Sequence, residues 1–165
     1  MTKLSEKIES VIQNDLHDEY SVISVMPNFL NKPINSDFIF IVDCSGSMSG
    51  SRIRNASECL SIFLHSLPIG CNFNIIMFGS DYHSVFGSGG LVEYNEANLK
   101  KADESVKEMK ANLGGTNLLG PLSFAYKQIE SVNEKGKVCQ IFLLTDGEIN
   151  DTETVFKLVN KNRTK

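Results

Sequence analysis

Hydroxyl and carboxylate side chains gather in three short, polar segments of this 165-residue chain. The oxygen donors in these segments are Asp43, Ser45, Ser47, Thr116 and Asp146. A set with few charges and no soft ligand suits a hard cation such as Mg²⁺, which prefers octahedral geometry and keeps some of its waters. The first three donors alternate along the chain, so a tight loop can turn all three oxygens inward. The sequence therefore predicts a Mg²⁺ site, with Mn²⁺ as a substitute of similar chemistry.

Secondary-structure elements beside each segment must bring the donors together. An uninterrupted apolar run over 38–42 predicts a strand covered on both faces, and it ends at the first segment. A second apolar strand, predicted over 138–145, ends at the third segment, while Thr116 precedes a helical pattern over 118–132. Ligands of parallel α/β sheets bind beyond the carboxyl ends of the strands. We therefore expect the three segments to meet at one edge of a sheet.

The rest of the pattern predicts an α/β fold, with a doubly wound, mostly parallel sheet and helices on both faces. Further helices are expected over 52–67, 95–109 and 152–160, and further strands over 72–78 and 84–86, with a hairpin turn between these two strands. This domain is predicted to occupy residues 36–165.

Residues 1–35 are predicted to form an amino-terminal extension with a helix, a strand and a linker. Apolar residues recur at helical spacing from Leu4 to Leu16, and residues 20–26 alternate in the manner of a strand. Two prolines and several asparagines over 27–36 are typical of a linker.

Composition excludes some classes of function. The formal net charge is −4, so a broadly basic surface for nucleic acid is not expected. The apolar runs are far shorter than the roughly 20 residues of a membrane span, and the first ten residues lack the apolar run of a signal peptide. The four cysteines form no CxxC pair. Packed, reduced thiols are therefore expected, which favours a cytoplasmic protein.

The three segments resemble the metal-ion-dependent adhesion site of the von Willebrand factor A domain. The likeness lies in "DCSGSMSG", "GGTNLLGPL" and "LLTDGE", which hold the five oxygen donors in the expected order. The stretches "DFIFIVDCSGSM" and "LPIGCNFNIIMFGS" are similar to the branch of inter-alpha-trypsin inhibitor heavy chains and the vault-associated poly(ADP-ribose) polymerase. The resemblance covers about residues 37–165.

This resemblance implies a protein-binding module. In the family the two serines and the threonine approach Mg²⁺, the aspartates act directly or through water, and a partner's Asp or Glu carboxylate completes the coordination. Two aspartates only just neutralise a dication, so an open position still favours an anionic oxygen. The family's domain also continues with a further strand, helix and strand, so the chain is expected to be truncated at its carboxyl end.

Two surfaces for partners are also expected. Ser80, Asp81, Tyr82 and His83 follow the strand over 72–78 and should lie on the same rim as the metal, where an aromatic ring is a typical anchor. The family's strand order leaves the strand over 138–145 at the edge of the sheet. An apolar edge favours self-association, unless the amino-terminal extension covers it.

Several alternatives use the same residues. Asp43 and the serines after it could cap the next helix, Gly114–Thr116 could be an ordinary helix-start loop, and Asp146-Gly147 could be a turn. The domain could also be a scaffold whose metal site is vestigial.

The enzyme alternative with most support is a Mg²⁺-dependent phosphatase with Asp43 as nucleophile. Phosphatases with an aspartate nucleophile of this type need a second aspartate two residues later, and Ser45 occupies that position here. Neither a P-loop, nor a GxSxG elbow, nor histidines at zinc-ligand spacing occur in the sequence. We therefore expect a non-catalytic domain.

Overall fold

The computed structural model describes residues 9–12, 23–26, 36–132, 137–147, 149 and 151–162, in two separate units, Met1–Pro33 and Ile34–Lys165. In the first unit, β1 (Glu9–Ile12) pairs antiparallel with β2 (Ile23–Met26). The helix expected around residues 4–16 is therefore wrong at 9–12, where the adjacent β-branched Val11 and Ile12 favour a strand. The expected strand over 20–26 is found at 23–26, and the linker expected over 27–36 lies outside the described residues except for Ser36.

The second unit is built on a five-stranded sheet. Its strands are β3 (Ser36–Asp43), β4 (Asn72–Phe78), β5 (Tyr82–Ser84), β6 (Val92–Glu93) and β7 (Val138–Leu144). The order is β5-β4-β3-β7, with β6 also paired to β4, so β7 lies at the edge of the sheet as expected. Strand β3 runs parallel to β4 and β7, whereas β5 and β6 run antiparallel to β4.

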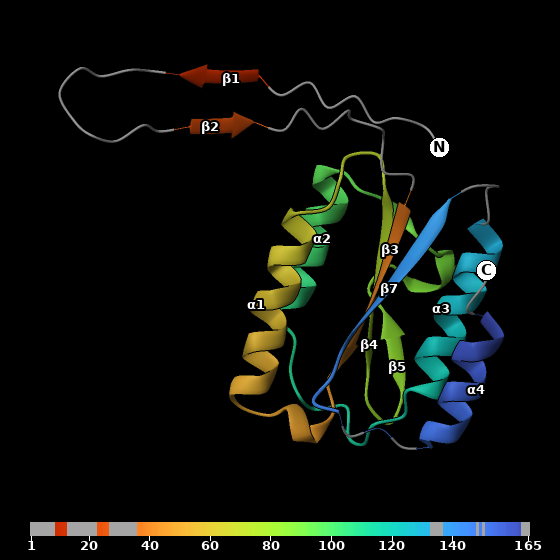
Figure 1. Ribbon diagram of the computed structural model, residues 1–165. Coiled ribbons are helices and arrows are strands. Elements are labelled where there is room, and N and C mark those ends of the chain that lie inside the picture. The colour runs from red at the N-terminus through yellow and green to blue at the C-terminus, as the bar shows by residue number, and fades with distance from the viewer. Residues whose placement is uncertain are drawn as a thin grey trace. The chain divides into compact units, whose positions relative to one another are not determined.

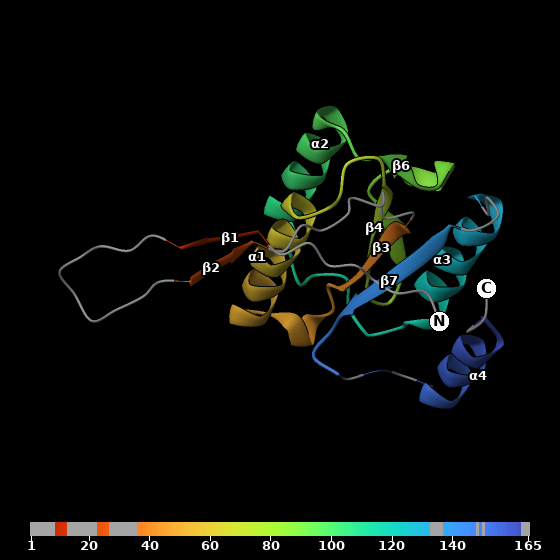
Figure 2. The same cartoon turned by 45° about the horizontal axis from the view of Figure 1, so that its top comes forward.

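Two pairs of helices cover the two faces of this sheet (Figures 1 and 2). One pair is α1 (Ser51–His65) with α2 (Glu96–Lys107), and the other is α3 (Leu119–Val132) with α4 (Thr152–Asn162). Strand β3 alternates between the faces: Phe40 packs in the core beneath α1 and α2, and Ile41 packs in the core beneath α3 and α4. Every side chain of β3 is buried, as expected for a central strand. The expected doubly wound, mostly parallel α/β fold is confirmed.

Strand register brings the polar segments to one edge of the sheet. Asp43 pairs with Phe78 of β4, and Val42 pairs with Leu144 of β7. The loops after β3, β4 and β7 therefore leave the sheet side by side. A short 3₁₀ turn, η1 (Gly46–Met48), then leads from β3 into α1.

Strand β7 lies at an edge of the sheet, because β3 is the only described strand that pairs with it. Val138 and Leu143 on this strand are 59% and 42% exposed. An apolar groove between β7, α3 and α4 is lined by Ile141, Tyr126 and Phe156, among other side chains. This edge therefore presents apolar surface as well as unpaired backbone.

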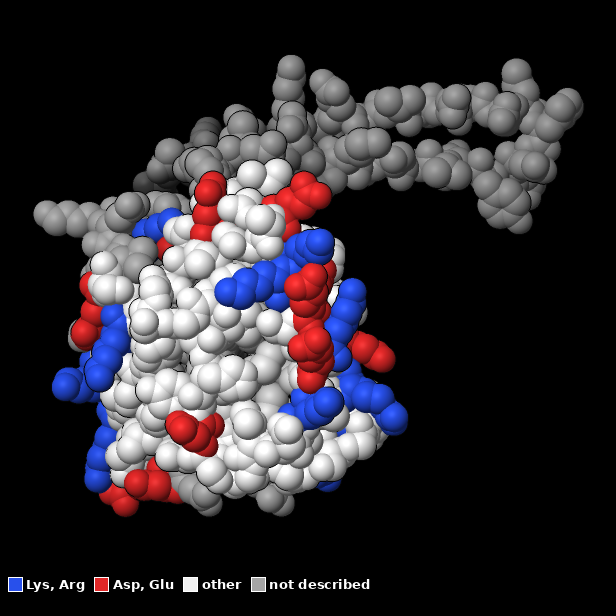
Figure 3. Space-filling view, turned by 180° about the vertical axis from the view of Figure 1, so that it is seen from behind, with Lys and Arg blue, Asp and Glu red and all other residues white. Residues whose placement is uncertain are grey.

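The rear face of the molecule carries charges of both signs (Figure 3). Acidic and basic side chains mix along its two sides, and side chains without formal charge fill most of its centre. Within the residues that the structure describes, no helix is long and apolar enough to cross a membrane.

Candidate metal centre

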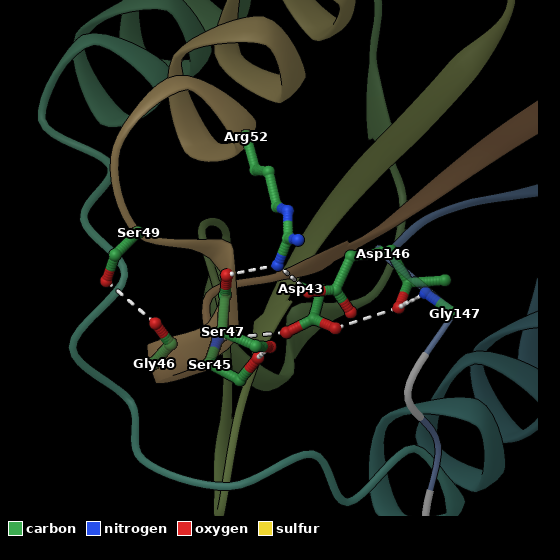
Figure 4. A network of polar contacts seen from close by, with 9 residues as sticks. Asp43, Ser45, Gly46, Ser47, Ser49, Arg52, Asp146 and Gly147 are labelled. Carbon is green, nitrogen blue, oxygen red and sulfur yellow. Dashed lines mark hydrogen bonds and ion pairs between the residues drawn. The ribbon is translucent and has the colours of Figure 1, made fainter.

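Asp43, the last residue of β3, stands at the centre of the candidate site. Its side chain is completely buried. Oδ1 accepts a hydrogen bond of 2.9 Å from the backbone N–H of Ser45, and Oδ2 accepts one of 2.8 Å from the hydroxyl of Thr145. Figure 4 shows these contacts converging on the carboxylate from two loops. The carboxylate is therefore held in one orientation by groups that follow two neighbouring strands.

Ser45 and Ser47 place two hydroxyl oxygens next to each other. The η1 turn folds the chain back at this point, and buried Met48 anchors the turn in the core. The Oγ atoms of the two serines are 3.0 Å apart and share a hydrogen bond in which either hydroxyl can be the donor. Neighbouring ligands of an octahedral Mg²⁺, each at about 2.1 Å, lie about 3.0 Å from one another. The spacing of this pair therefore fits two adjacent positions around such an ion.

Backbone hydrogen bonds hold the loop that carries Thr116 against the serine loop. Gly46 N–H donates to the carbonyl of Gly114 over 2.8 Å, and Leu113 N–H donates to the carbonyl of Cys44 over 3.0 Å. Gly114 has φ +80°, a backbone conformation that residues other than glycine rarely adopt. Thr116 follows two residues later and is 9% exposed. The structure thus brings the second polar segment alongside the first.

Asp146 follows β7 and completes the group of loops. Its side chain is 9% exposed, and its Oδ2 lies 3.1 Å from Nη1 of Arg52 on α1. The same nitrogen donates a hydrogen bond of 2.9 Å to the carbonyl of Ser47. Arg52 therefore bridges the loop after β3 and the loop after β7 (Figure 4).

Chemically, the site offers hard oxygen donors. No group of three or more His, Cys, Asp or Glu side chains able to hold a metal occurs in the described part of the chain. The candidate set is of another type, with two carboxylates and three hydroxyls. Burial, aided by the charge of Asp43, raises the pKa of Cys44 to about 12, so this nearby thiol is protonated in the metal-free protein. The donors present fit Mg²⁺ or Mn²⁺ better than zinc.

The four predicted rim residues have different surroundings. Ser80 supports the loops, because its Oγ accepts a hydrogen bond of 2.8 Å from Gly115 N–H. Asp81 Oδ1 accepts one from the adjacent N–H of Tyr82. Tyr82 is 36% exposed, and its ring packs on Phe124 of α3 with 5.5 Å between the ring centroids.

His83 is exposed on β5. It also lines a second, more polar cavity together with Met77, Glu108 and Lys110. Tyr82 and His83 therefore remain available as rim contacts, whereas Ser80 has a structural role. Strand β5 begins at Tyr82, two residues before its predicted start at residue 84, because the turn closes tightly through a hydrogen bond from Gly79 N–H to the carbonyl of Asp81.

Sequence reasoning missed two residues of this site. Thr145 was predicted only as the end of a strand, and Arg52 only as the start of a helix. A signal for Thr145 was its position directly before Asp146, at the carboxyl end of an apolar strand. For Arg52 the sequence offers no comparable signal, because its contact with Asp146 joins residues 94 positions apart.

Comparisons with known proteins agree with this architecture. Residues 36–165 match the family model of the von Willebrand factor type A domain. The chain is 41% identical over 160 residues to von Willebrand factor A domain-containing protein 5A of Homo sapiens, covering 90% of this chain and 20% of that protein. It is 37% identical over 170 residues to protein 5B1 of Mus musculus, covering 96% of this chain and 13% of that protein.

A solved structure shares the fold. The von Willebrand factor type A protein from Catenulispora acidiphila superposes with a TM-score of 0.66 at 22% identity, over 84% of this chain and 32% of that one. The chain spans a fifth or less of the length of the two curated relatives. The family model and the identities together show that the chain belongs to the von Willebrand factor A domain family.

Proposed function

We propose that this domain binds a protein partner through a divalent cation. Mg²⁺ would be held by Asp43, Ser45, Ser47, Thr116 and Asp146, and a partner's Asp or Glu carboxylate would fill an open position. The observation that carries this proposal is the 3.0 Å separation of the Ser45 and Ser47 hydroxyls beside a buried, oriented carboxylate. When bound, the ion supplies a Lewis-acidic position for an anionic oxygen.

Membership of the von Willebrand factor A domain family supports a role in protein–protein interaction. The rim residues Tyr82 and His83 would contact the partner next to the metal. An exposed aromatic ring supplies contact area with little loss of side-chain entropy.

A catalytic role is less well supported. Nucleophilic attack needs an accessible oxygen, whereas the Asp43 side chain is completely buried and both its oxygens accept hydrogen bonds. A buried, fixed carboxylate is better suited to holding an ion than to forming a covalent intermediate with a substrate. We therefore propose a binding domain rather than an enzyme.

One observation favours a second candidate, a scaffold whose metal site is vestigial. Arg52 lies 3.1 Å from Asp146 and thus neutralises one of the two carboxylates without a metal. If this ion pair is permanent, the site holds no dication under physiological conditions. A direct binding measurement separates the two candidates.

The test is calorimetric titration of Mg²⁺ into protein freed of metal with a chelator. The wild-type protein should bind one ion, and Ser45→Ala should weaken or abolish this binding. Thermal unfolding gives an independent readout, because an ion at one hundred times its dissociation constant adds about 2.7 kcal/mol to the free energy of unfolding.

Ser49→Ala is the matched control. Ser49 lies in the same loop, and its hydroxyl donates to the carbonyl of Gly46 at an exposed position outside the predicted ligand set. It should bind Mg²⁺ like the wild type. If no heat is released and the melting temperature does not move, the vestigial-scaffold candidate replaces the proposal.

A further inference from the structure

Arg52 occupies an unusual place for a cation, at the mouth of a candidate cation site. It is the second residue of α1, which follows the serine loop directly. One nitrogen, Nη1, contacts both the Ser47 carbonyl and Asp146 Oδ2, and Figure 4 shows the guanidinium directed toward the carboxylates. A positive group on a predicted metal ligand must affect how the metal binds.

Exposure differs sharply between the two members of this ion pair. The Arg52 side chain is 59% exposed, whereas the Asp146 side chain is 9% exposed. An exposed guanidinium on a flexible stem can leave its partner and be solvated at little cost. Asp146, held in the loop after β7, stays in the site. Arg52 is therefore the member that can move when another cation arrives.

Formal charges give this arrangement a consequence for partner binding. Two carboxylates and one guanidinium leave the empty site at −1, and a bound dication brings it to +1. Without Arg52, the same site would have no net charge when the dication is bound. The guanidinium therefore weakens binding of the dication alone, and it strengthens binding of an anion once the dication is in place.

We propose that Arg52 competes with Mg²⁺ for Asp146 and, when displaced, binds the partner's carboxylate next to the metal. The planar fork of a guanidinium matches a carboxylate in geometry and charge. Metal and carboxylate then bind cooperatively, and each raises the affinity of the other by the same factor. This inference rests on the proposed function and adds a residue that determines specificity for an anionic partner.

The experiment titrates Mg²⁺ into chelator-treated protein by calorimetry, with and without sodium acetate as the carboxylate probe. Sodium chloride replaces acetate at equal ionic strength, so that screening is the same. The variants are Arg52→Gln, which keeps a polar side chain without charge, and Arg52→Lys, which keeps the charge without the fork. Arg54→Gln, an exposed arginine of the same helix, is the matched control.

In chloride, Arg52→Gln should bind Mg²⁺ about tenfold more tightly than the wild type, since a repelling charge is gone. Acetate should tighten Mg²⁺ binding in the wild type and have much less effect in Arg52→Gln. Arg52→Lys should keep the weaker affinity for Mg²⁺ and show a smaller effect of acetate. Arg54→Gln should match the wild type in both buffers. Circular dichroism checks that every variant is folded.

The outcomes separate this inference from the proposed function. Equal Mg²⁺ affinity in wild type, Arg52→Gln and Arg54→Gln would overturn the role of Arg52 and leave the metal site standing. An equal effect of acetate in wild type and Arg52→Gln would overturn the coupling. Binding in Arg52→Gln alone would show that Arg52 excludes the metal from the wild type, and this result would overturn both the proposed function and the coupling to a partner carboxylate. If no variant binds Mg²⁺, the proposed function fails, and this inference fails with it.

Discussion

Thr145 and Asp43 join the carboxyl ends of two neighbouring strands through one hydrogen bond. The Thr145 hydroxyl donates to Oδ2 of Asp43 over 2.8 Å, although the residues are 102 positions apart in the chain. The same hydroxyl oxygen accepts a hydrogen bond of 3.2 Å from Gly147 N–H. One side chain therefore orients the buried carboxylate and shapes the loop that carries Asp146. Thr145 is a positioning residue for the candidate site.

Replacing Thr145 by valine should lower the free energy of unfolding by about 1–3 kcal/mol, because a buried carboxylate oxygen loses a donor. It should also weaken Mg²⁺ binding, since Asp43 is no longer held in place. Urea unfolding and calorimetry measure the two effects. Thr145→Ser is the control, and it should retain most of the stability because the hydroxyl remains. Wild-type stability and affinity in Thr145→Val would contradict this role.

Tyr82 should contribute to stability as well as to the rim. The sequence predicted only a rim contact for this residue, but the ring packs on Phe124 and lies against Gly120, where an added Cβ would come within 3.0 Å of it. Tyr82→Ala should therefore cost about 1–2 kcal/mol in urea unfolding. Tyr82→Phe, which keeps the ring, should unfold like the wild type. An unchanged midpoint in Tyr82→Ala would show that the contact contributes nothing.

The cysteines should react with thiol reagents at different rates in the folded protein. Burial raises the pKa of Cys44 and of Cys139 from 9.0 to about 12, whereas Cys59 is exposed. In folded protein at pH 8–9, a thiol reagent should therefore label Cys59 first, and Cys59→Ala should remove this fast phase. Fast labelling of Cys44 in folded Cys59→Ala would contradict its burial.

The raised pKa values of Cys44 and Cys139 also predict how the free energy of unfolding changes with pH. The folded protein holds the two protons more tightly than the unfolded chain does, so their contribution is complete below about pH 9. It is lost progressively as the pH rises from about 9 toward 12. Urea unfolding at pH 8 and pH 10 measures the expected decrease in the free energy of unfolding.

Strand β7 should promote self-association at high protein concentration. Its outer edge is unpaired among the described strands, and Leu143 is 42% exposed. Light scattering over a concentration series should show a rising average mass. Leu143→Lys should remain monomeric, because a charge on an edge strand opposes pairing. A wild-type protein that stays monomeric throughout the series would contradict this expectation.

Most of the fold could be predicted from the sequence because its signals are local. Apolar runs revealed β3, β4 and β7, and β4 was predicted with the bounds that it has, Asn72–Phe78. The helices begin and end within about two residues of their predicted bounds. The two-residue strand β6 is too short to leave a pattern of its own. Apolar spacing alone could not separate a helix from a strand in the first unit, where β1 forms by pairing with β2.

The site was predictable only in part, for a physical reason. The residue types and their positions after strands identified Asp43, Ser45 and Asp146, since strand ends meet at one edge of a parallel sheet. The contacts of Thr145 and Arg52 depend instead on side-chain geometry between loops that are distant in sequence. Whether the five donors hold a metal is still a prediction, and it is the central one.

The most direct test is X-ray diffraction from crystals soaked in Mn²⁺, recorded at a wavelength where manganese scatters anomalously. We predict one strong anomalous peak within about 2.5 Å of the Ser45 and Ser47 hydroxyls and next to Asp43. Arg52 should then have moved away from Asp146. A peak elsewhere, or no peak at this site in a concentration that saturates Mn²⁺ binding in solution, would contradict the account.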